Sequence, residues 1–306
     1  MPKIKSFKPN LVGRDFVIGD LHGSLSAFEN LLLNLNFDKT KDRMFSVGDL
    51  VDRGPESLKC LGLLQEDWFH AVLSNHEQMM LQAFTGGPLG YFWTMNGGHW
   101  GLEALNDAAA AMDGKATRIP LDESIELFDY LPLVENLPFL ITVELLDGRS
   151  IHIIHAELPP HRAINDADLA SEDYLTDLIT VESRDGSYIL WGRHKFYSFA
   201  QNSLADLDKV RRTVKYHYDK VPDQEGLSHI VSGYTIIQHP MTILGQTNID
   251  TGAYRMYEGR NGSYDKHPKW AALTAIELNT WKFYQATDTE FREVDPIVVN
   301  RDDITT

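Results

Sequence analysis

Short apolar runs alternate with amphipathic segments through the first 75 residues of the chain. Residues 16–19, 44–47 and 71–73 each have the length and apolar character of a buried strand. Between these runs, residues 24–35 repeat apolar side chains at three- and four-residue steps, and residues 56–65 form a second helical segment. Strands that alternate with helices at this short spacing predict a parallel sheet with crossover connections.

The second half of the chain has mainly β patterns. Asp147 and Gly148 lie between the apolar runs 139–145 and 150–154, which is a strong signal for a hairpin. Further strands are expected at 188–190, 229–232 and 241–244, with a terminal hairpin over 274–285.

No shift in composition divides the chain, so we predict one α/β domain over residues 1–306. Residues 78–111 are rich in aromatic residues and glycine, and they indicate an insert at about 78–135. The acidic segment at about 161–187 is expected to form a lid over the domain.

Charge and cysteine content limit the partners and the compartment. The chain has 28 basic and 44 acidic residues, a formal net charge of −16, so its surface repels the phosphates of nucleic acids. Its apolar runs are far shorter than the ~20 residues of a membrane-spanning helix. The single cysteine, Cys60, cannot form an internal disulfide, and the N-terminus lacks a secretory pattern. We therefore expect a cytoplasmic protein with no nucleic-acid or membrane partner.

Polar side chains follow four of the strand-like runs. Asp20 and His22 follow the first run, Asp49 the second, Asn75 the third, and His155 follows residues 150–154. Because the carboxyl ends of parallel strands converge on one crevice, we expect these side chains to meet there. Mixed nitrogen and oxygen ligands suit Mn²⁺, Fe or Zn²⁺ better than Ca²⁺, which prefers oxygen alone. Each cluster alone would be an ordinary turn or helix start, but together they favour one metal site, in which Asp49 can bridge two ions.

Three sequence blocks carry a family resemblance. The segments GDLHG (19–23), GDLVDRG (48–54) and SNHE (74–77) resemble the signature of the PPP-type serine/threonine phosphoprotein phosphatases, within the calcineurin-like metallophosphoesterases. Ser74 stands where the third block usually has glycine. Further similar segments are Asn96-Gly97-Gly98, typical of the bacterial and phage branch, then residues 155–157, 191–193 and 250–253. The resemblance therefore covers most of the chain.

The resemblance implies a fold and a metal centre. The fold would be a metallophosphoesterase-type central β-sandwich flanked by helices, with the active site at the C-terminal ends of strands. Two divalent ions would be bound, manganese being favoured and iron or zinc being alternatives. Asp20 and His22 would hold one ion, Asp49 would bridge, and Asn75 and His155 would hold the second.

The resemblance also implies an activity, the hydrolysis of phosphomonoesters in phosphoproteins or small molecules. A hydroxide between the metals would attack phosphorus directly, His76 would be the general acid, and Asp52 would orient it. Arg53 and Arg193 would bind the phosphate, because guanidinium groups match phosphate oxygens. Phosphoserine and phosphothreonine are the first expected substrates, with phosphotyrosine as a further one. The alternative enzyme is a symmetrical diadenosine tetraphosphate hydrolase, which usually lacks the carboxylate equivalent to Asp52.

One residue departs from the family pattern. The family has Gly-His-Thr after a late strand, and its histidine is a further ligand of the second metal, but here Tyr234 takes that place. Tyr234 could ligate as a phenolate, His229 or His239 could take over, or the site could keep three ligands, which is the interpretation we favour. A catalytically weakened phosphate-binding relative is therefore a further alternative. Of the nearby aromatic residues, Tyr91, Trp93 and Trp100 are expected to pack in the core or a loop.

Overall fold

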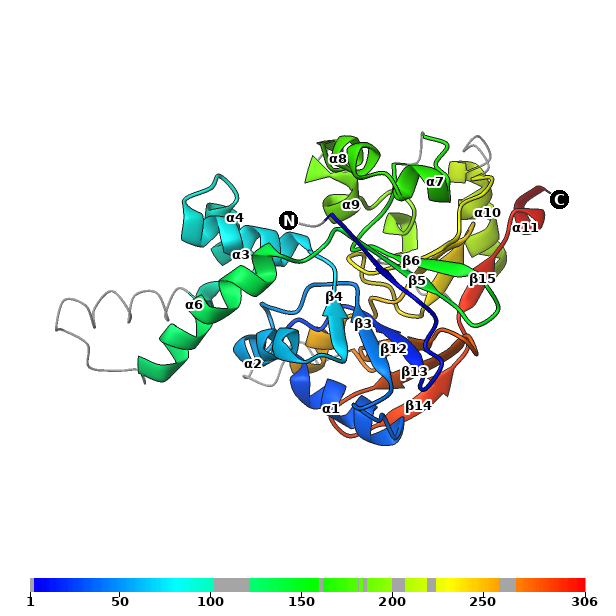
Figure 1. Ribbon diagram of the computed structural model, residues 1–306. Coiled ribbons are helices and arrows are strands. Elements are labelled where there is room, and N and C mark those ends of the chain that lie inside the picture. The colour runs from blue at the N-terminus through cyan, green and yellow to red at the C-terminus, as the bar shows by residue number, and fades with distance from the viewer. Residues whose placement is uncertain are drawn as a thin grey trace.

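Two β-sheets face each other at the centre of the molecule (Figure 1). The computed structural model describes residues 3–101, 121–159, 162–180, 182–183, 186–199, 207–218, 224–258 and 268–305. The first sheet has seven strands in the order β1 (Ile4–Phe7), β5 (Leu140–Glu144), β6 (Ser150–Ile153), β9 (His229–Ser232), β11 (Gln246–Asn248), β10 (Met241–Ile243) and β15 (Ile297–Val299). The second has six, in the order β14 (Phe291–Val294), β13 (Lys282–Ala286), β12 (Leu273–Glu277), β2 (Asp15–Ile18), β3 (Arg43–Ser46) and β4 (Phe69–Ala71).

Strands β2, β3 and β4 pair in parallel, as the alternation of strands and helices predicts. The two predicted hairpins also form, because β5 pairs with β6 and β12 pairs with β13 in antiparallel register. Gly148 lies in the first hairpin turn with φ +86°, a conformation that glycine adopts without strain. The mixed α/β class and the central pair of sheets are therefore confirmed.

Alternation of side chains builds two apolar layers around the second sheet. Val17 of β2 and Phe45 of β3 point between the sheets, where they join Val143, Ile153 and other buried residues of the first sheet. Phe16 and Ile18 belong to the other layer, which packs against the helices. Both faces of the parallel strands are thus buried, which explains why their sequences are continuous apolar runs.

Helices surround this centre in three groups. Helices α1 (Leu25–Asn34) and α2 (Ser57–Gly62), with the 3₁₀ turn at Leu63–Gln65, cover the outer face of the second sheet. Helices α3 (Asn75–Thr85), α4 (Gly90–Met95) and α6 (Leu121–Glu135) form an arm that stands away from the sheets (Figure 1). Helices α7 (Asp166–Leu169), α8 (Glu172–Thr180) and α9 (Tyr188–Trp191) lie beside the first sheet, with α10 (Leu207–Tyr218) and α11 (Asp302–Thr305) further along it.

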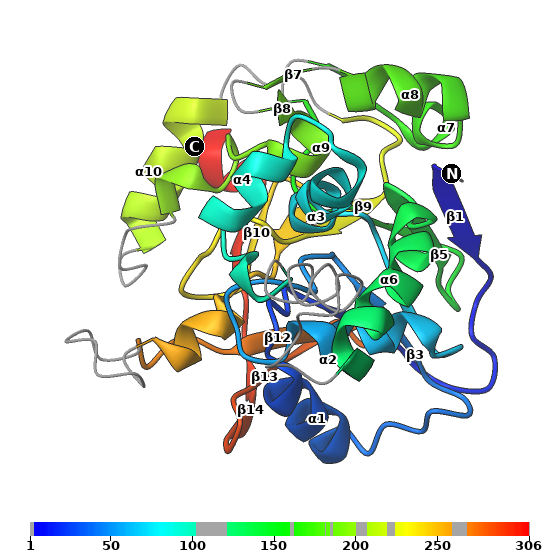
Figure 2. The ribbon, with the colours of Figure 1, turned by 90° about the vertical axis from the view of Figure 1, so that its left-hand side faces the viewer.

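Figure 2 views the molecule from the side of the arm, with α3 and α4 between α9 above and α2 below. The remaining short elements are strands β7 (Glu182–Ser183) and β8 (Gly186–Ser187) and two 3₁₀ turns, Tyr197–Phe199 and Ala253–Tyr257. None of the described helices combines the length and the apolar character needed to cross a bilayer.

Some expected elements differ from the structure. Residues 188–190, expected as a strand, form α9, because a short run that is buried on all sides has no periodicity to distinguish strand from helix. The third strand ends at Ala71, so residues 72–74 instead lead into α3. The insert at about 78–135 contains the arm helices, and the lid at about 161–187 contains α7 and α8, but residues 102–120, 160–161, 181 and 184–185 lie outside the described chain. A single domain with this insert and lid therefore stays a prediction.

Candidate active site

Most of the polar residues singled out in the sequence meet at one edge of the two sheets. Asp20 and His22 follow β2, Asp49, Asp52 and Arg53 lie in the loop after β3, Asn75 and His76 begin α3, and His155 follows β6. Asp20, Asp49 and His155 bring one potential ligand atom each within 4.8 Å of one another, and so do His22, Asp49 and His76. Asp49 belongs to both groups, which otherwise place Asp20 with His155 and His22 with His76, so the division of the ligands between two ions stays a prediction. Asn75 completes the cluster, since its Oδ1 lies 2.8 Å from Nε2 of His155.

Backbone carbonyls orient the two imidazoles expected to bind metal. Nδ1 of His22 donates to the carbonyl of Val51, and Nδ1 of His155 donates to that of Val47, both at 2.8 Å. The Nε2 atoms consequently face Asp49, at 3.1 Å for His22 and 3.5 Å for His155. Burial lowers the pKa of both imidazoles, which favours their neutral form. A neutral imidazole whose other nitrogen is hydrogen-bonded to a carbonyl is the typical form of a metal-binding histidine.

Three buried carboxylates carry the negative charge of the site. Burial raises the pKa of Asp20 well above its usual range, and the neighbouring Asp250 and Asp49 raise it further. Burial would also raise the pKa of Asp49, but the imidazoles of His76, His155 and His22 hold it well below its usual range. Oδ2 of Asp250 is buried and has no hydrogen-bond partner among the residues that the structure describes. Such crowded carboxylates call for positive charge, so these residues fit a pair of divalent cations.

His76 and Asp52 form a second unit beside the carboxylates. Nδ1 of His76 lies 2.6 Å from Oδ2 of Asp52, and both side chains are buried. Nε2 of His76 points the other way and accepts a hydrogen bond from the Arg53 guanidinium at 3.0 Å. The same guanidinium donates to Nε2 of His22 at 2.8 Å and lies 4.9 Å from the ring centroid of Tyr254. Arg53 therefore extends over the cluster, where an anion would enter.

Arg193 contacts the site through Tyr234. Its guanidinium lies 4.2 Å from the ring centroid of Tyr234. Burial lowers the pKa of Arg193, but the Tyr234 phenol, which is hydrogen-bonded to it, and the carboxylates of Asp250 and Asp49 raise the pKa overall. Arg193 is thus within electrostatic reach of the carboxylates, as the phosphate-binding hypothesis requires.

Tyr234 lies inside the cluster with an unusual backbone. Its φ is +69°, and its backbone N–H donates to both carboxylate oxygens of Asp20, at 3.2 and 3.1 Å. The centroid of the Tyr234 ring lies 5.2 Å from the centroid of the His155 imidazole. Tyr234, which replaces the usual histidine, therefore contacts the site twice. Its backbone contacts Asp20, and its ring contacts His155.

The two histidines considered as substitutes for that ligand face other partners. His229 is at the first residue of β9, the end away from Tyr234, and its Nε2 lies 2.7 Å from Oγ1 of Thr247. His239 is partly buried, and burial and the charge of Arg292 lower its pKa. Neither belongs to the groups of potential metal ligands found among the described residues.

Glu77 is a site residue that our sequence analysis did not single out. Its carboxylate accepts hydrogen bonds from the backbone N–H groups of Asp49, Leu50 and Val51, at 3.1, 2.9 and 3.3 Å, and also from the Ser74 hydroxyl. The Ser74 hydroxyl in turn accepts from the N–H groups of His76 and Glu77 at the start of α3. Burial and the nearby Asp49 carboxylate raise the pKa of Glu77 to about 8. The Ser-x-x-Glu spacing of a capping box was the available sequence signal, and it also explains how serine replaces glycine here.

Comparison with known proteins agrees with this geometry. The family described as "Calcineurin-like phosphoesterase" matches residues 16–233. The chain is 37% identical over 145 residues to "Serine/threonine-protein phosphatase 1" of Salmonella typhimurium, a match that spans 47% of this chain and 59% of that protein. It is 29% identical over 238 residues to "Serine/threonine-protein phosphatase 2" of Escherichia coli, which covers 78% of this chain and 87% of that protein.

Other relatives are named symmetrical bis(5'-nucleosyl)-tetraphosphatases. A crystal structure described as a candidate diadenosine tetraphosphatase shares the fold, with a TM-score of 0.51 at 18% identity over 94% of this chain and 99% of that one. The family match covers more than half of the chain and every site residue predicted from the sequence, from Asp20 to Arg193, whereas Tyr234, Asp250 and Tyr254 lie beyond it. The chain therefore belongs to the calcineurin-like phosphoesterase family.

Proposed function

We propose that this protein is a metal-dependent phosphomonoester hydrolase that acts on phosphoproteins, at phosphoserine and phosphothreonine first and at phosphotyrosine as a further substrate. One observation supports it above all: potential ligands of two cations, a carboxylate-bound histidine and two guanidinium groups converge on one buried edge of the sheets. The two named relatives described above act as serine/threonine phosphatases according to their names.

The proposed chemistry assigns a task to each group. Asp20 and His22 would hold one cation, Asp49 would be shared, and Asn75 and His155 would hold the other. When bound, the two ions supply Lewis-acid activation of water and neutralise charge on the phosphate. Mixed carboxylate, amide and imidazole donors favour Mn²⁺, with iron or zinc as alternatives.

The remaining side chains handle the substrate. Arg53 and Arg193 bind phosphate oxygens, which draws the Arg53 guanidinium away from the imidazoles it now contacts. Once it is released from Arg53, Nε2 of His76 can take up a proton from water, and the resulting imidazolium, held at Nδ1 by Asp52, can give that proton to the leaving oxygen. No protein nucleophile is needed, which agrees with the burial of Cys60 and with the raised pKa of its thiol. The single cysteine also supports the expectation of a cytoplasmic location.

Two alternatives rest on particular residues. A symmetrical diadenosine tetraphosphatase is supported by the names of some relatives, whereas Asp52, held against His76, favours the phosphoprotein phosphatase. A weakened phosphate-binding protein is suggested by Tyr234, which adds no second imidazole beside that of His155 to the second cation.

A substrate panel with added Mn²⁺ tests the proposal. We expect release of phosphate from a phosphoserine peptide and from an aryl phosphate, faster than cleavage of diadenosine tetraphosphate. Asp49→Asn should remove both metal binding, measured by elemental analysis, and turnover. Lys59→Ala, which changes an exposed residue of α2, is the matched control and should keep both. Preferential cleavage of diadenosine tetraphosphate would establish the rival enzyme, and phosphate binding without turnover would establish the weakened relative.

A further inference from the structure

Two tryptophan side chains of the arm hydrogen-bond to the carboxylate of Asp52. Nε1 of Trp93 lies 3.0 Å from both Oδ1 and Oδ2 of Asp52, and Nε1 of Trp100 lies 2.7 Å from Oδ1. Oδ2 also accepts from His76, so every hydrogen bond found on this carboxylate among the described residues comes from an aromatic N–H. The Asp52 side chain is fully buried, and water does not compete for these bonds.

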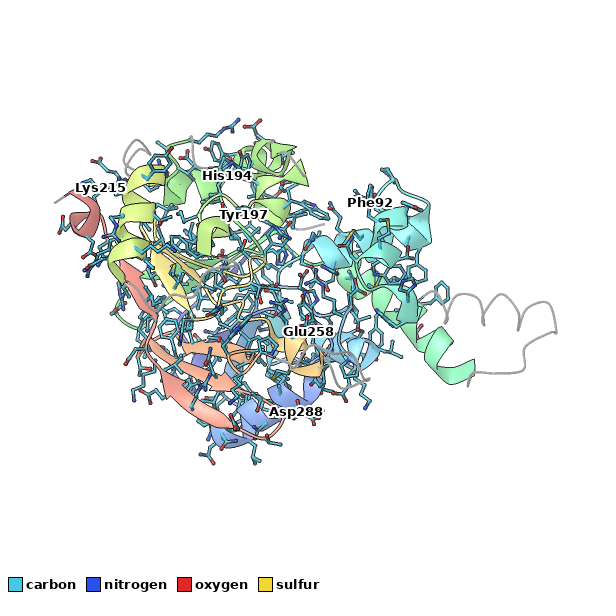
Figure 3. All side chains as sticks on the ribbon, turned by 180° about the vertical axis from the view of Figure 1, so that it is seen from behind. Phe92, His194, Tyr197, Lys215, Glu258 and Asp288 are labelled. Atoms are coloured by element: carbon cyan, nitrogen blue, oxygen red, sulfur yellow. The ribbon has the colours of Figure 1, made fainter. Side chains whose placement is uncertain are left out.

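The arm is folded so as to present these indoles. On α4, Phe92, labelled on the arm in Figure 3, is 49% exposed, whereas the next residue, Trp93, is fully buried. Gly98 and Gly101 lie against the Trp93 indole so closely that a Cβ at either would approach ring atoms to 2.5 and 2.3 Å. The Trp100 ring packs edge-on against Trp93, at 6.0 Å between centroids. The glycines and the second indole thus hold Trp93 in one orientation.

Glycine at position 97 extends the same contact to the loop after β3. Gly97 has φ +113°, and a Cβ there would lie 2.9 Å from the backbone nitrogen of Arg53 and 3.3 Å from Cβ of Asp52. The Asn-Gly-Gly segment is therefore the point at which the arm closes on the loop that carries Asp52. Asp52 and Arg53 themselves have φ of +75° and +69°, conformations that surrounding contacts must maintain.

An indole is suited to holding a carboxylate in place because its N–H can only donate a hydrogen bond. A carboxylate that is rotated about its Cβ–Cγ bond still accepts hydrogen bonds, so His76 alone does not fix the plane of the Asp52 side chain. Three donors in fixed positions do fix it, and donors to an ionised oxygen make strong hydrogen bonds. Trp cannot turn an acceptor toward Asp52, as the amide of Gln or the hydroxyl of Tyr could.

We propose that Trp93 and Trp100 are positioning residues for the reaction: they hold the Asp52 carboxylate in the orientation that presents the imidazole of His76 to the leaving oxygen. This inference rests on the proposed function, and it assigns to the arm a task beyond covering the core. Both indoles were expected to serve packing only, and Trp93 does pack, but its N–H has a directed partner as well.

Kinetics of indole deletions test the proposal. Trp93→Phe and Trp100→Phe each remove one N–H while keeping an aromatic ring. Hydrogen-bond partners that orient a functional side chain typically contribute about 10- to 100-fold to activity. We therefore expect kcat on an alkyl phosphate, which needs its leaving group protonated, to fall by about 10-fold or more. We expect KM to stay within about two-fold, and kcat on an aryl phosphate to fall much less, because that leaving group needs little help.

Trp68→Phe is the matched control. Its indole is also buried and hydrogen-bonded to a carboxylate, Glu66, at 2.7 Å, but it lies against α1 rather than in the site. It should leave both rates unchanged. Equal losses on alkyl and aryl substrates in the Trp100→Phe variant would overturn the proposal, because they would indicate general structural damage.

A readout without catalysis separates this inference from the proposed function. The chain has six tryptophans, each with an indole N–H that gives one resonance in a ¹⁵N-correlated NMR spectrum. Asp52→Asn removes the negative charge that Trp93 and Trp100 face, so their two resonances should move upfield while that of Trp68 stays. If neither moves, the indoles do not bind the carboxylate and the inference fails. If they move but the wild-type protein hydrolyses no phosphomonoester, the proposed function fails and so does the kinetic role assigned to the indoles.

Discussion

Nδ1 of His76 donates to Oδ2 of Asp52 across 2.6 Å, while Nε2 of the same ring faces the Arg53 guanidinium. In the proposed mechanism the first nitrogen orients the ring and the second acts on the substrate. This arrangement makes a kinetic prediction for His76→Asn. A positioned general acid contributes about 10²- to 10⁴-fold, so turnover of alkyl phosphates should fall by that order, and turnover of aryl phosphates by much less.

Asp52→Asn serves as the companion variant, since it keeps the shape of the side chain but removes the charge that holds Nδ1–H. Asp52→Asn should also lower turnover more on alkyl than on aryl phosphates, and its losses should be somewhat smaller than those of His76→Asn. Rates measured with a series of phenyl and alkyl phosphates check both variants. Losses independent of the leaving group would remove His76 from the role of acid.

The Tyr234 side chain makes a prediction about metal binding. In the proposed assignment the second cation would have three ligands, Asp49, Asn75 and His155, and Tyr234→His would add the fourth that the family usually has. Histidine also tolerates the positive φ of +69° at this position. Affinity for a second Mn²⁺ should increase by about ten-fold or more, since even outer-sphere changes alter metal affinity to that extent.

Titration calorimetry and elemental analysis check this, and Tyr234→Phe is the control, because it keeps the ring but adds no donor. Unchanged stoichiometry and affinity in Tyr234→His would mean that the phenol already ligates or that no imidazole can reach the ion from this position.

Sequence patterns could locate the candidate ligands because two rules act together. Continuous apolar runs identified β2 and β3 almost to the residue, and the polar residues after parallel strands share an edge of the sheet whatever the rest of the fold is. The positions of Asp20, Asp49 and Asn75 therefore followed from the chain itself, and the roles of individual residues came from the family resemblance.

The supporting residues could not be found in this way, because their partners are distant in sequence. Trp93 and Trp100 bind a carboxylate 41 and 48 residues earlier in the chain, and an aromatic residue in a glycine-rich segment carries no sign of that partner. Asp250 stands alone after a short strand, and its proximity to Asp20 depends on how the two sheets face each other. The edge strands β1, β14 and β15 are short and partly exposed, so their sequences lack the apolar pattern of the central strands.

Glu77 makes a prediction about stability. Above its pKa of about 8, Glu77 is ionised and its two oxygens accept three N–H groups of residues 49–51, so at such a pH Glu77→Gln replaces one of those acceptors with a donor that faces backbone donors. An unsatisfied buried donor costs about 1–3 kcal/mol, so the free energy of unfolding should fall by about 2 kcal/mol. Metal affinity should weaken as well, because Asp49 belongs to the displaced loop.

Urea unfolding monitored by fluorescence, with and without Mn²⁺, measures both effects. Glu66→Gln is a suitable control, since Glu66 binds one indole N–H near the surface. Wild-type stability in Glu77→Gln would show that the loop after β3 is held by its other contacts.

His70 gives the stability a defined dependence on pH. It lies on β4 between the rings of Phe7 and Phe45, at 4.4 and 5.4 Å. Burial, together with the charges of Lys5 and Arg43, lowers its pKa from 6.5 to about 4. Between pH 6.5 and about 4, His70 is protonated in the unfolded chain but stays neutral in the folded protein. Acidification over this range therefore stabilises the unfolded state, and the free energy of unfolding decreases as the pH falls.

His70→Phe removes this proton uptake while keeping an aromatic ring in the cluster. At pH 7 the two proteins should differ only through packing. At pH 5 the wild type should have lost about 1–2 kcal/mol more than the variant, since one pKa unit corresponds to 1.36 kcal/mol. Thermal unfolding at half-unit steps between pH 7 and 4 measures the two slopes, and groups shared by both proteins, such as His229, whose pKa is also lowered to about 4, cancel in the comparison. If the free energy of unfolding depends on pH equally in the two proteins, His70 has the same pKa in the folded protein as in the unfolded chain. Burial and the charges of Lys5 and Arg43 would then not lower that pKa.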